Sequence, residues 1–190
     1  MPQPDRVNAK TVQKCRDFDD ENLAKRILRR LYIGYLRHKY HFFAVGEGFK
    51  WGKNWRVRKG VLTIGDFVFI GPDAHIIYPT VIGDLTLLAP GVHIVGDDHG
   101  FTRVGEPMRL ASPEIDSKNL VTIIEAEVWI GQRATLKHGI KVGRGSIIAT
   151  GSIVTKDVPR YAIVAGNPAK IIRMRFNPEE IERHEKELYG

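Results

Sequence analysis

The stretch GVHIVGDDHGF, residues 91–101, places His99 directly after two aspartates and before a glycine. A neutral imidazole titrates near physiological pH and can accept a proton from a hydroxyl within hydrogen-bond reach. Asp97 or Asp98 could orient the ring, although a carboxylate on a loop is more often simply solvated. Whether His99 takes part in chemistry therefore depends on the elements that hold this stretch.

A six-residue repeat surrounds this stretch and predicts those elements. An aliphatic residue recurs in one phase through two blocks: Ile64, Ile70, Ile76, Ile82, Leu88, Ile94, then Ile124, Ile130, Leu136, Val142, Ile148 and Val154. A period of six fits short strands joined by tight corners, with three hexads making one triangular coil. Glycine often follows the aliphatic, where it should permit backbone angles that a Cβ opposes. The sequence thus predicts an all-β solenoid of four coils, stacked about 4.8 Å apart around a dry aliphatic core.

The repeat stops between the two blocks. The segment at about residues 96–119 is rich in glycine, proline, serine and charge. Because the blocks stay in phase across it, we expect the chain to leave the solenoid at one corner and to return at the next strand. Long loops inside compact domains are typically functional or disordered. His99 is therefore expected at the start of a projecting loop.

The N-terminal region has a helical pattern. Within residues 20–45, Leu23, Ile27, Leu31 and Tyr35 share one stripe, and many lysines and arginines lie elsewhere. One interpretation is a helix that caps the open end of the solenoid, which would otherwise expose its last coil. The other is a basic amphipathic surface that makes peripheral contact with anionic lipid or a lipid-linked glycan. The pattern favours the cap.

The C-terminal region predicts a short helix. Asn177 is suited to the N-cap, and a proline and two glutamates follow it. The expected organisation is a helical, basic cap at 1–60, the hexapeptide-repeat β-helix at 61–159 and a tail with a short helix at 160–190.

Composition limits the function classes. The 190 residues suit one domain, and the single cysteine, Cys15, cannot form an internal disulfide. Neither a signal peptide nor an apolar run long enough to cross a bilayer is visible, so we expect a soluble, cytoplasmic protein. The net charge of +7 and the pI near 9.6 suggest an anionic partner: nucleic acid, an acidic membrane surface or a phosphorylated small molecule.

One segment carries a family resemblance. Residues 128–173, VWIGQRATLKHGIKVGRGSIIATGSIVTKDVPRYAIVAGNPAKIIR, combine the hexads with a specific GSIVTKDVP…AGNPAK pattern. The chain, over about residues 60–175, resembles the hexapeptide-repeat acyltransferases, particularly maltose, galactoside and polysaccharide O-acetyltransferases. The resemblance implies a left-handed parallel β-helix, a homotrimer, and acetyl-CoA bound in a groove between neighbouring solenoids. It also implies O-acetylation of a sugar or polysaccharide hydroxyl, with no metal required.

The resemblance also implies roles for individual residues. It makes His99 the general base that takes the proton of the acceptor hydroxyl during direct attack on the thioester. The CoA-binding residues that it implies are Gln132, Thr150, Thr155, Lys156, Lys170 and Arg173. The last two are cationic and would meet the nucleotide phosphates. This chain departs from the family pattern at Lys137, His138 and Gly139, where relatives often have Leu-Pro-Gly, and these charged and titratable side chains at a corner could alter the groove. Its N-terminal segment does not align with the helical domain that helps define the acceptor of the maltose and galactoside enzymes, so the acceptor stays open.

Other functions remain open. The same scaffold supports an N-acetyltransferase of an amino sugar and a xenobiotic acetyltransferase. It also occurs in γ-class carbonic anhydrases, where three histidines bind zinc. His75 and His93 are separated by three hexads, one full coil, and should stack, with His99 one hexad later, although these spacings differ from the pattern of that class. A scaffold or nucleic-acid binder would explain the charge, but the repeat lacks aromatic-basic interleaving, so no nucleic-acid partner is expected.

Overall fold

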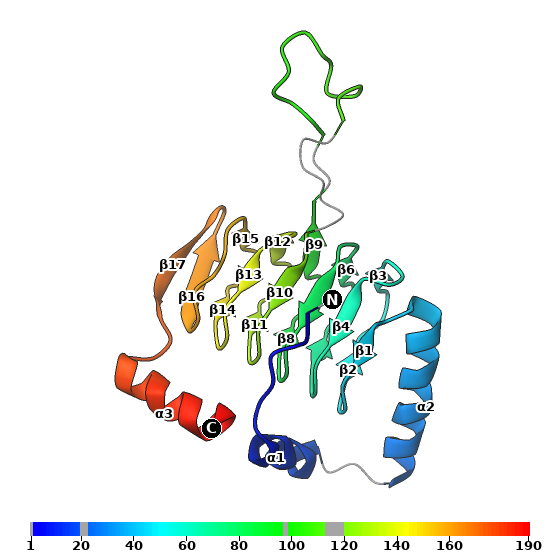
Figure 1. Cartoon of the computed structure of the whole chain (residues 1–190), viewed down its shortest axis with the longest axis vertical. Coiled ribbons are helices and arrows are strands. Elements are labelled where there is room, and N and C mark those ends of the chain that lie inside the picture. Colours follow the sequence, from blue (N-terminus) through cyan, green and yellow to red (C-terminus); the bar gives the residue numbers. More distant parts are fainter. Residues whose placement is uncertain (1, 20–22, 97–98, 113–119) are drawn as a thin grey trace.

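Three sheets wind into a triangular solenoid in the computed structural model, which describes residues 2–19, 23–96, 99–112 and 120–190 (Figure 1). Sheet A contains β1 (Ala44–Val45), β4 (Leu62–Ile64), β7 (Thr80–Ile82), β10 (Thr122–Ile124) and β13 (Lys141–Val142). Sheet B contains β2 (Lys50–Trp51), β5 (Phe69–Ile70), β8 (Leu87–Leu88), β11 (Trp129–Ile130), β14 (Ile147–Ile148), β16 (Ala162–Gly166) and β17 (Ala169–Met174). Sheet C contains β3 (Arg56–Val57), β6 (His75–Ile76), β9 (His93–Val95), β12 (Thr135–Lys137) and β15 (Ile153–Val154). The sheets are parallel, apart from the antiparallel pair β16–β17.

The repeated aliphatic residues form the core. Each of the residues that set the hexad phase is at most 2% exposed. Ile82 pairs with Ile64 on one side and with Ile124 on the other, so one column continues across the loop. Burying such a side chain contributes about 1.5–3 kcal/mol. The predicted fold class, a parallel β-helix with helical ends, is confirmed, as is the common phase of the two blocks.

The glycines that follow the aliphatic residues have a different purpose from the one expected. A Cβ on Gly83 would lie 2.5 Å from the Ala126 nitrogen, and one on Gly131 would lie 2.6 Å from the Thr150 nitrogen. These glycines therefore let successive coils approach closely. The left-handed backbone angle falls two residues later, for example at Arg133 (φ 56°). The expectation that glycine supplies the corner angle was wrong at these positions.

The solenoid begins earlier than residue 61. Strands β1, β2 and β3 make an additional coil, in which Val57 of β3 pairs with Ile76 of β6. This separation along the chain exceeds three hexads by a single position, whereas the coils from β4 to β15 repeat every three hexads wherever no loop intervenes. A search in the phase of Ile64 therefore missed this coil. Part of the segment expected as the cap at 1–60 belongs to the β-helix.

Helix α2 (Leu23–Tyr40) covers the first coil. Leu36 is buried, Ile33 and Tyr40 pack partly buried against the core, and Tyr32 stacks on Trp51 with ring centroids 4.9 Å apart. The stripe predicted from the sequence is a different face: Ile27, Leu31 and Tyr35 are exposed. The side chain of Leu23 lies outside the described residues. The helix thus contacts the solenoid through residues that the pattern did not select.

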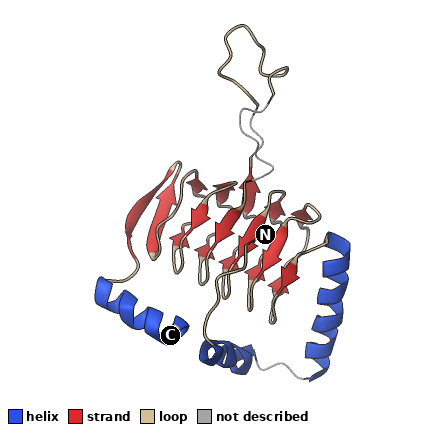
Figure 2. Ribbon diagram, in the orientation of Figure 1, coloured by secondary structure: helices blue, strands red, loops and turns tan. Residues whose placement is uncertain are grey.

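Helices α1 (Ala9–Asp19) and α3 (Pro178–Tyr189) lie on another side of the solenoid (Figure 2). The predicted start of the C-terminal helix is confirmed. The Asn177 side chain accepts a hydrogen bond from the Glu180 backbone N–H at 2.9 Å, and the Glu180 carboxylate accepts one from the Asn177 N–H at 2.9 Å. This reciprocal capping box fixes the first turn.

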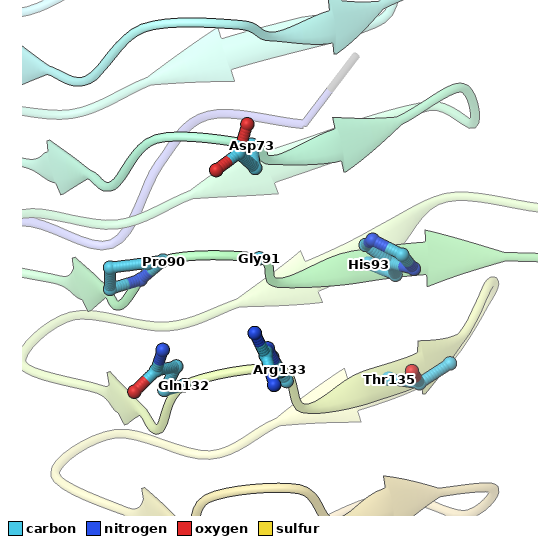
Figure 3. A pocket seen from close by; sticks show the side chains of 7 residues that line it. All are labelled: Asp73, Pro90, Gly91, His93, Gln132, Arg133 and Thr135. Carbon is cyan, nitrogen blue, oxygen red and sulfur yellow. The ribbon is translucent and has the colours of Figure 1, made fainter.

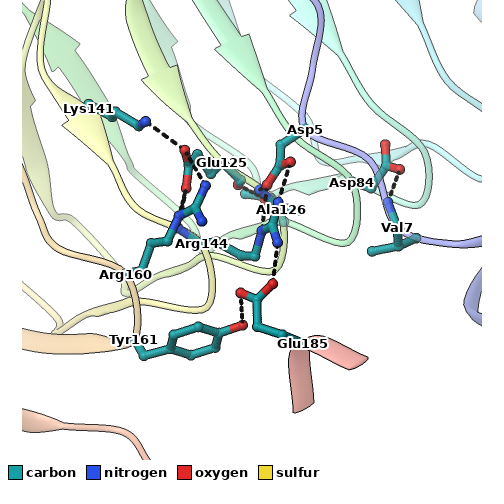
Figure 4. Close-up of polar contacts among 11 residues, drawn as sticks. Asp5, Val7, Asp84, Glu125, Ala126, Lys141, Arg144, Arg160, Tyr161 and Glu185 are labelled. Carbon is teal, nitrogen blue, oxygen red and sulfur yellow. Dashed lines mark hydrogen bonds and ion pairs between the residues drawn. The ribbon is translucent and has the colours of Figure 1, made fainter. Parts of the chain in front are cut away.

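Ion pairs join both chain ends to the A–B corner, which we define as the turns after β4, β7, β10 and β13 (Figure 4). Arg144, whose side chain is 12% exposed, pairs with Asp5 at 2.7 Å and with Glu185 of α3 at 2.5 Å. Glu125 accepts hydrogen bonds from Arg160 at 2.8 and 3.2 Å. Burial alone would raise the pKa of Glu125, but Arg160, Lys141 and the Arg144 backbone N–H outweigh it and lower the pKa to about 2. This corner is therefore closed by structural contacts.

Candidate functional site

The candidate residues lie at the two corners that border sheet C. We call the turns after β5, β8, β11 and β14 the B–C corner, and the turns after β6, β9, β12 and β15 the C–A corner. Gln132 and Thr150 occupy equivalent positions of successive coils at the B–C corner, and both are exposed. The Gly151 N–H donates to the Gln132 carbonyl at 2.8 Å, which fixes the spacing of these two turns.

The β16–β17 hairpin carries the two predicted cations. Lys170 pairs with Ala165 and Arg173 with Ile163, and both cationic side chains are exposed. The Gly166 N–H donates to the Ser152 hydroxyl at 3.3 Å, so the hairpin turn lies beside the B–C corner. Gln132, Thr150 and Lys170 therefore follow one edge of the solenoid toward its C-terminal end.

Thr155 and Lys156 lie at the C–A corner, immediately after β15, and are exposed. The loop that carries His99 leaves the solenoid at this same corner, after β9. Strand β12, which lies between β9 and β15 in sheet C, pairs with both of them. Thr155 and Lys156 are thus two coils from the root of the loop, whereas Gln132 and Thr150 lie across sheet C from it.

His99 is exposed, and the described part of its loop, residues 99–112, projects away from the coils (Figure 1). Asp97 and Asp98, which could orient its ring, lie outside the described residues. Large apolar side chains are exposed on this loop: Phe101, Val104, Met108 and Leu110. The described part of the loop therefore carries His99 and an apolar surface away from the coils.

A pocket of about 370 Å³ opens between the B–C corner and the outer face of sheet C (Figure 3). It is lined by Asp73, Pro90, Gly91, His93, Gln132, Arg133 and Thr135. Gln132 was predicted to bind CoA. Arg133 was not predicted to be a site residue. It is the residue of its turn that has a left-handed backbone, which marks its position at the corner. The pocket thus combines a predicted ligand residue with an arginine and a histidine.

His93 lies in a column of side chains on the outer face of sheet C. His75 stands directly beside it in the neighbouring coil, with ring centroids 5.4 Å apart and planes at 85°. Burial lowers the pKa of His75, and the nearby His93 and Arg56 lower it further. The predicted stacking of the two histidines is confirmed. Nevertheless, the described residues contain no group of three or more His, Cys, Asp or Glu side chains placed to hold a metal ion.

His138 lies under the root of the loop. Its ring stacks on Tyr78 with centroids 4.5 Å apart, and its Nδ1 is 3.2 Å from the Val95 carbonyl oxygen. The side chain is 6% exposed and packs against Gly96. The sequence indicated that His138 could alter the ligand groove. Because it is buried, it instead forms part of the support from which the loop departs.

Comparison with known proteins identifies the family. The model of the bacterial transferase hexapeptide (six repeats) matches residues 62–96 and 122–156, the blocks on either side of the loop. A protein named "Putative lipopolysaccharide biosynthesis O-acetyl transferase" from Escherichia coli (strain K12) is 33% identical over 144 residues, which cover 70% of this chain and 72% of that protein. The chain belongs to the hexapeptide-repeat transferase family. The resemblance read from the VWIG and AGNPAK segments is thereby confirmed.

Further relatives of this hexapeptide-repeat protein are acetyltransferases by name. A chloramphenicol acetyltransferase of Klebsiella aerogenes is 57% identical over 60 residues, but the match spans 32% of this chain and only 29% of that protein. A hexapeptide-repeat-containing acetyltransferase of Vibrio cholerae has 25% identity and a TM-score of 0.63, covering 75% of this chain and 79% of that one. A galactoside acetyltransferase in complex with coenzyme A has 27% identity and a TM-score of 0.53, covering 70% of this chain and 68% of that one.

Proposed function

We propose that this hexapeptide-repeat protein is an acetyl-CoA-dependent O-acetyltransferase that acts on a hydroxyl of a sugar or polysaccharide. The observation that carries the proposal is the match to the Escherichia coli O-acetyl transferase, which spans most of both chains. The likeness to a galactoside acetyltransferase bound to coenzyme A supports the same donor and a sugar acceptor. The proposed location is the cytoplasm.

His99 is the proposed general base. Its neutral imidazole accepts the proton of the acceptor hydroxyl while the oxygen attacks the thioester carbonyl carbon. The tetrahedral intermediate then collapses: the carbon–sulfur bond breaks, and the departing thiolate takes the proton from the imidazolium. The products are the acetyl ester and free CoA thiol. No acyl-enzyme is needed, because the thioester is already activated and both substrates are held together.

The exposed residues around sheet C have the chemistry that acetyl-CoA requires. Gln132 and Thr150 offer neutral polar groups along the B–C corner, where a pantetheine arm can run parallel to the solenoid axis. Lys170 and Arg173 lie further along, exposed on β17, and supply positive charge for the phosphates. Thr155 and Lys156, across sheet C, are proposed to contact the donor held by a neighbouring subunit.

A homotrimer is the proposed working unit, because the CoA-binding residues at the B–C corner and the proposed base lie apart within one chain. Gln132 and the root of the His99 loop lie on opposite edges of sheet C, so a groove between two solenoids is needed to unite them. The exposed apolar side chains of the loop, together with Ile171 and Ile172 of β17, favour burial against a neighbour. Light scattering of the purified protein should give the mass of three chains.

A xenobiotic acetyltransferase is the second candidate, favoured by the 57% identity to a chloramphenicol acetyltransferase. The chemistry is the same, and only the acceptor differs. A third possibility on the same scaffold, N-acetylation of an amino sugar, differs in the nucleophile alone.

One experiment tests the donor and separates the acceptors. Release of CoA thiol from acetyl-CoA is measured, corrected for hydrolysis, in metal-free buffer with mono- and oligosaccharides, amino sugars and chloramphenicol. The proposal predicts turnover with a sugar hydroxyl and an O-acetyl ester as the product. Turnover only with chloramphenicol or only at an amine would replace the proposed acceptor, and failure to bind CoA in a thermal-shift assay would contradict the proposed donor.

A further inference from the structure

Helix α2 has a second apolar face that points away from the protein. Ile27, Leu28, Leu31 and Tyr35 are 50%, 65%, 68% and 51% exposed. Their spacing of three and four positions aligns them along one side of the helix, and we call these four residues the outward stripe. The side of the helix that packs on the first coil is a different one. The outward stripe is therefore not required to close the end of the solenoid.

Positive charge flanks the outward stripe. The helix contains six lysines and arginines in its 18 residues and no acidic residue. At about 100° of rotation per residue, Arg30 lies about 60° beyond one edge of the stripe and Lys39 about 20° beyond the other, whereas Arg26 and Arg37 lie further round the helix. All four are exposed. The surface is thus an apolar band between two cationic borders.

An anionic bilayer complements this surface. Apolar side chains enter the boundary between head groups and acyl chains, and the bordering cations approach the lipid phosphates. A second copy of the same helix is a poorer partner, because pairing two stripes would bring cationic borders together with no acidic residue in either helix. In Figure 1, α2 is the outermost element at its end of the solenoid, where it can approach a flat surface.

We propose that the outward stripe and its cationic borders dock the protein on an anionic membrane surface. Within the described ranges, no helix is long and apolar enough to cross a bilayer, so the contact would be peripheral. The inference rests on the surface of α2 and does not depend on the proposed acyl transfer. Its test therefore uses lipid binding and not activity.

The test is co-sedimentation with vesicles of phosphatidylcholine alone and of phosphatidylcholine mixed with phosphatidylglycerol. Two double variants remove the apolar and the cationic parts separately: Leu28→Ser with Leu31→Ser, and Arg30→Gln with Lys39→Gln. The parent should bind the anionic vesicles and not the neutral ones. Each variant should weaken that binding about tenfold or more. Because the altered side chains are exposed, thermal midpoints should stay unchanged.

The matched control is Arg183→Gln with Lys186→Gln on α3, which removes the same charge from exposed positions away from α2. It should bind anionic vesicles nearly as well as the parent. Three results would overturn the inference: no binding by the parent, equal loss in the control, or unchanged binding after removal of the two leucines. If the leucine variant instead had a smaller mass by light scattering than the parent, another copy of the chain would be the partner of the stripe.

Discussion

The A–B corner and the corners beside sheet C are built from the same hexads but have opposite surroundings. Both use a left-handed residue in the turn, Glu127 (φ 59°) at the A–B corner and Arg133 (φ 56°) at the B–C corner. At the A–B corner, the N-terminal segment and α3 cover the turn, and its charged side chains pair with one another. Beside sheet C the polar side chains stay exposed. The repeat therefore sets the backbone, and what packs outside each corner decides whether its side chains stabilise the fold or remain available to a ligand.

The largest expected contrast is in stability. Arg144→Ala leaves Asp5 and Glu185 without their cation in a partly buried network and should cost about 3 kcal/mol of unfolding free energy. For a chain of this size, that is a drop in Tm of roughly 10 °C. Arg173→Ala, at an exposed arginine of β17, should leave the Tm almost unchanged. Equal drops in calorimetry would remove the distinction between the corners.

CoA affinity should show the opposite pattern: the exposed cations of β17 should matter, and a cation of α3 should not. Lys170→Ala or Arg173→Ala should each weaken CoA affinity about tenfold, as for loss of a charge-assisted contact to phosphate. Lys186→Ala on α3 removes the same charge and should leave the affinity within experimental error. Isothermal titration of the three variants measures this. An effect of Lys186→Ala as large as the other two would mean that net charge alone attracts the ligand.

Acid should weaken the A–B corner. The pKa of Glu125 is about 2 in the folded protein, below its usual value of 4.5. Its stabilising contribution is therefore complete above pH 4.5 and is lost as the pH falls toward 2. The difference in Tm between the parent and Glu125→Gln should be greatest above pH 4.5 and should shrink through this window. A difference that stays constant would contradict the ionic role.

A smaller pH effect is expected on sheet C. The pKa of His75 is lowered from 6.5, so protonation is harder in the folded state than in the unfolded chain. Stability is unaffected above pH 6.5 and decreases as the pH falls below it. His75→Gln should remove this part of the decrease. Identical Tm curves for the two proteins between about pH 7 and pH 5 would contradict the assignment.

Features set by residues close together in the sequence were predicted better than features set by contacts between distant segments. The hexads predicted the buried column, because burial follows directly from the repeat. The break between the two in-phase blocks predicted where the His99 loop leaves the solenoid. The first coil was missed because one inserted residue changed the phase before Ile64. The outward face of α2 was misread because helical periodicity marks an apolar stripe without saying what covers it. The role of Arg133 in the pocket and the ion pairs of Arg144 could not be predicted, since they depend on contacts between distant segments.

His99 on the projecting loop, and not His93 in the pocket, is the proposed base. The most direct test is kcat for acetyl transfer with saturating acetyl-CoA, compared between His99→Ala and His93→Ala. We expect His99→Ala to lose about 100-fold or more in kcat, while His93→Ala keeps most of its kcat and CoA binding survives in both. A large loss in His93→Ala with near-parental kcat in His99→Ala would contradict this role of His99 and place the reaction at the pocket on sheet C.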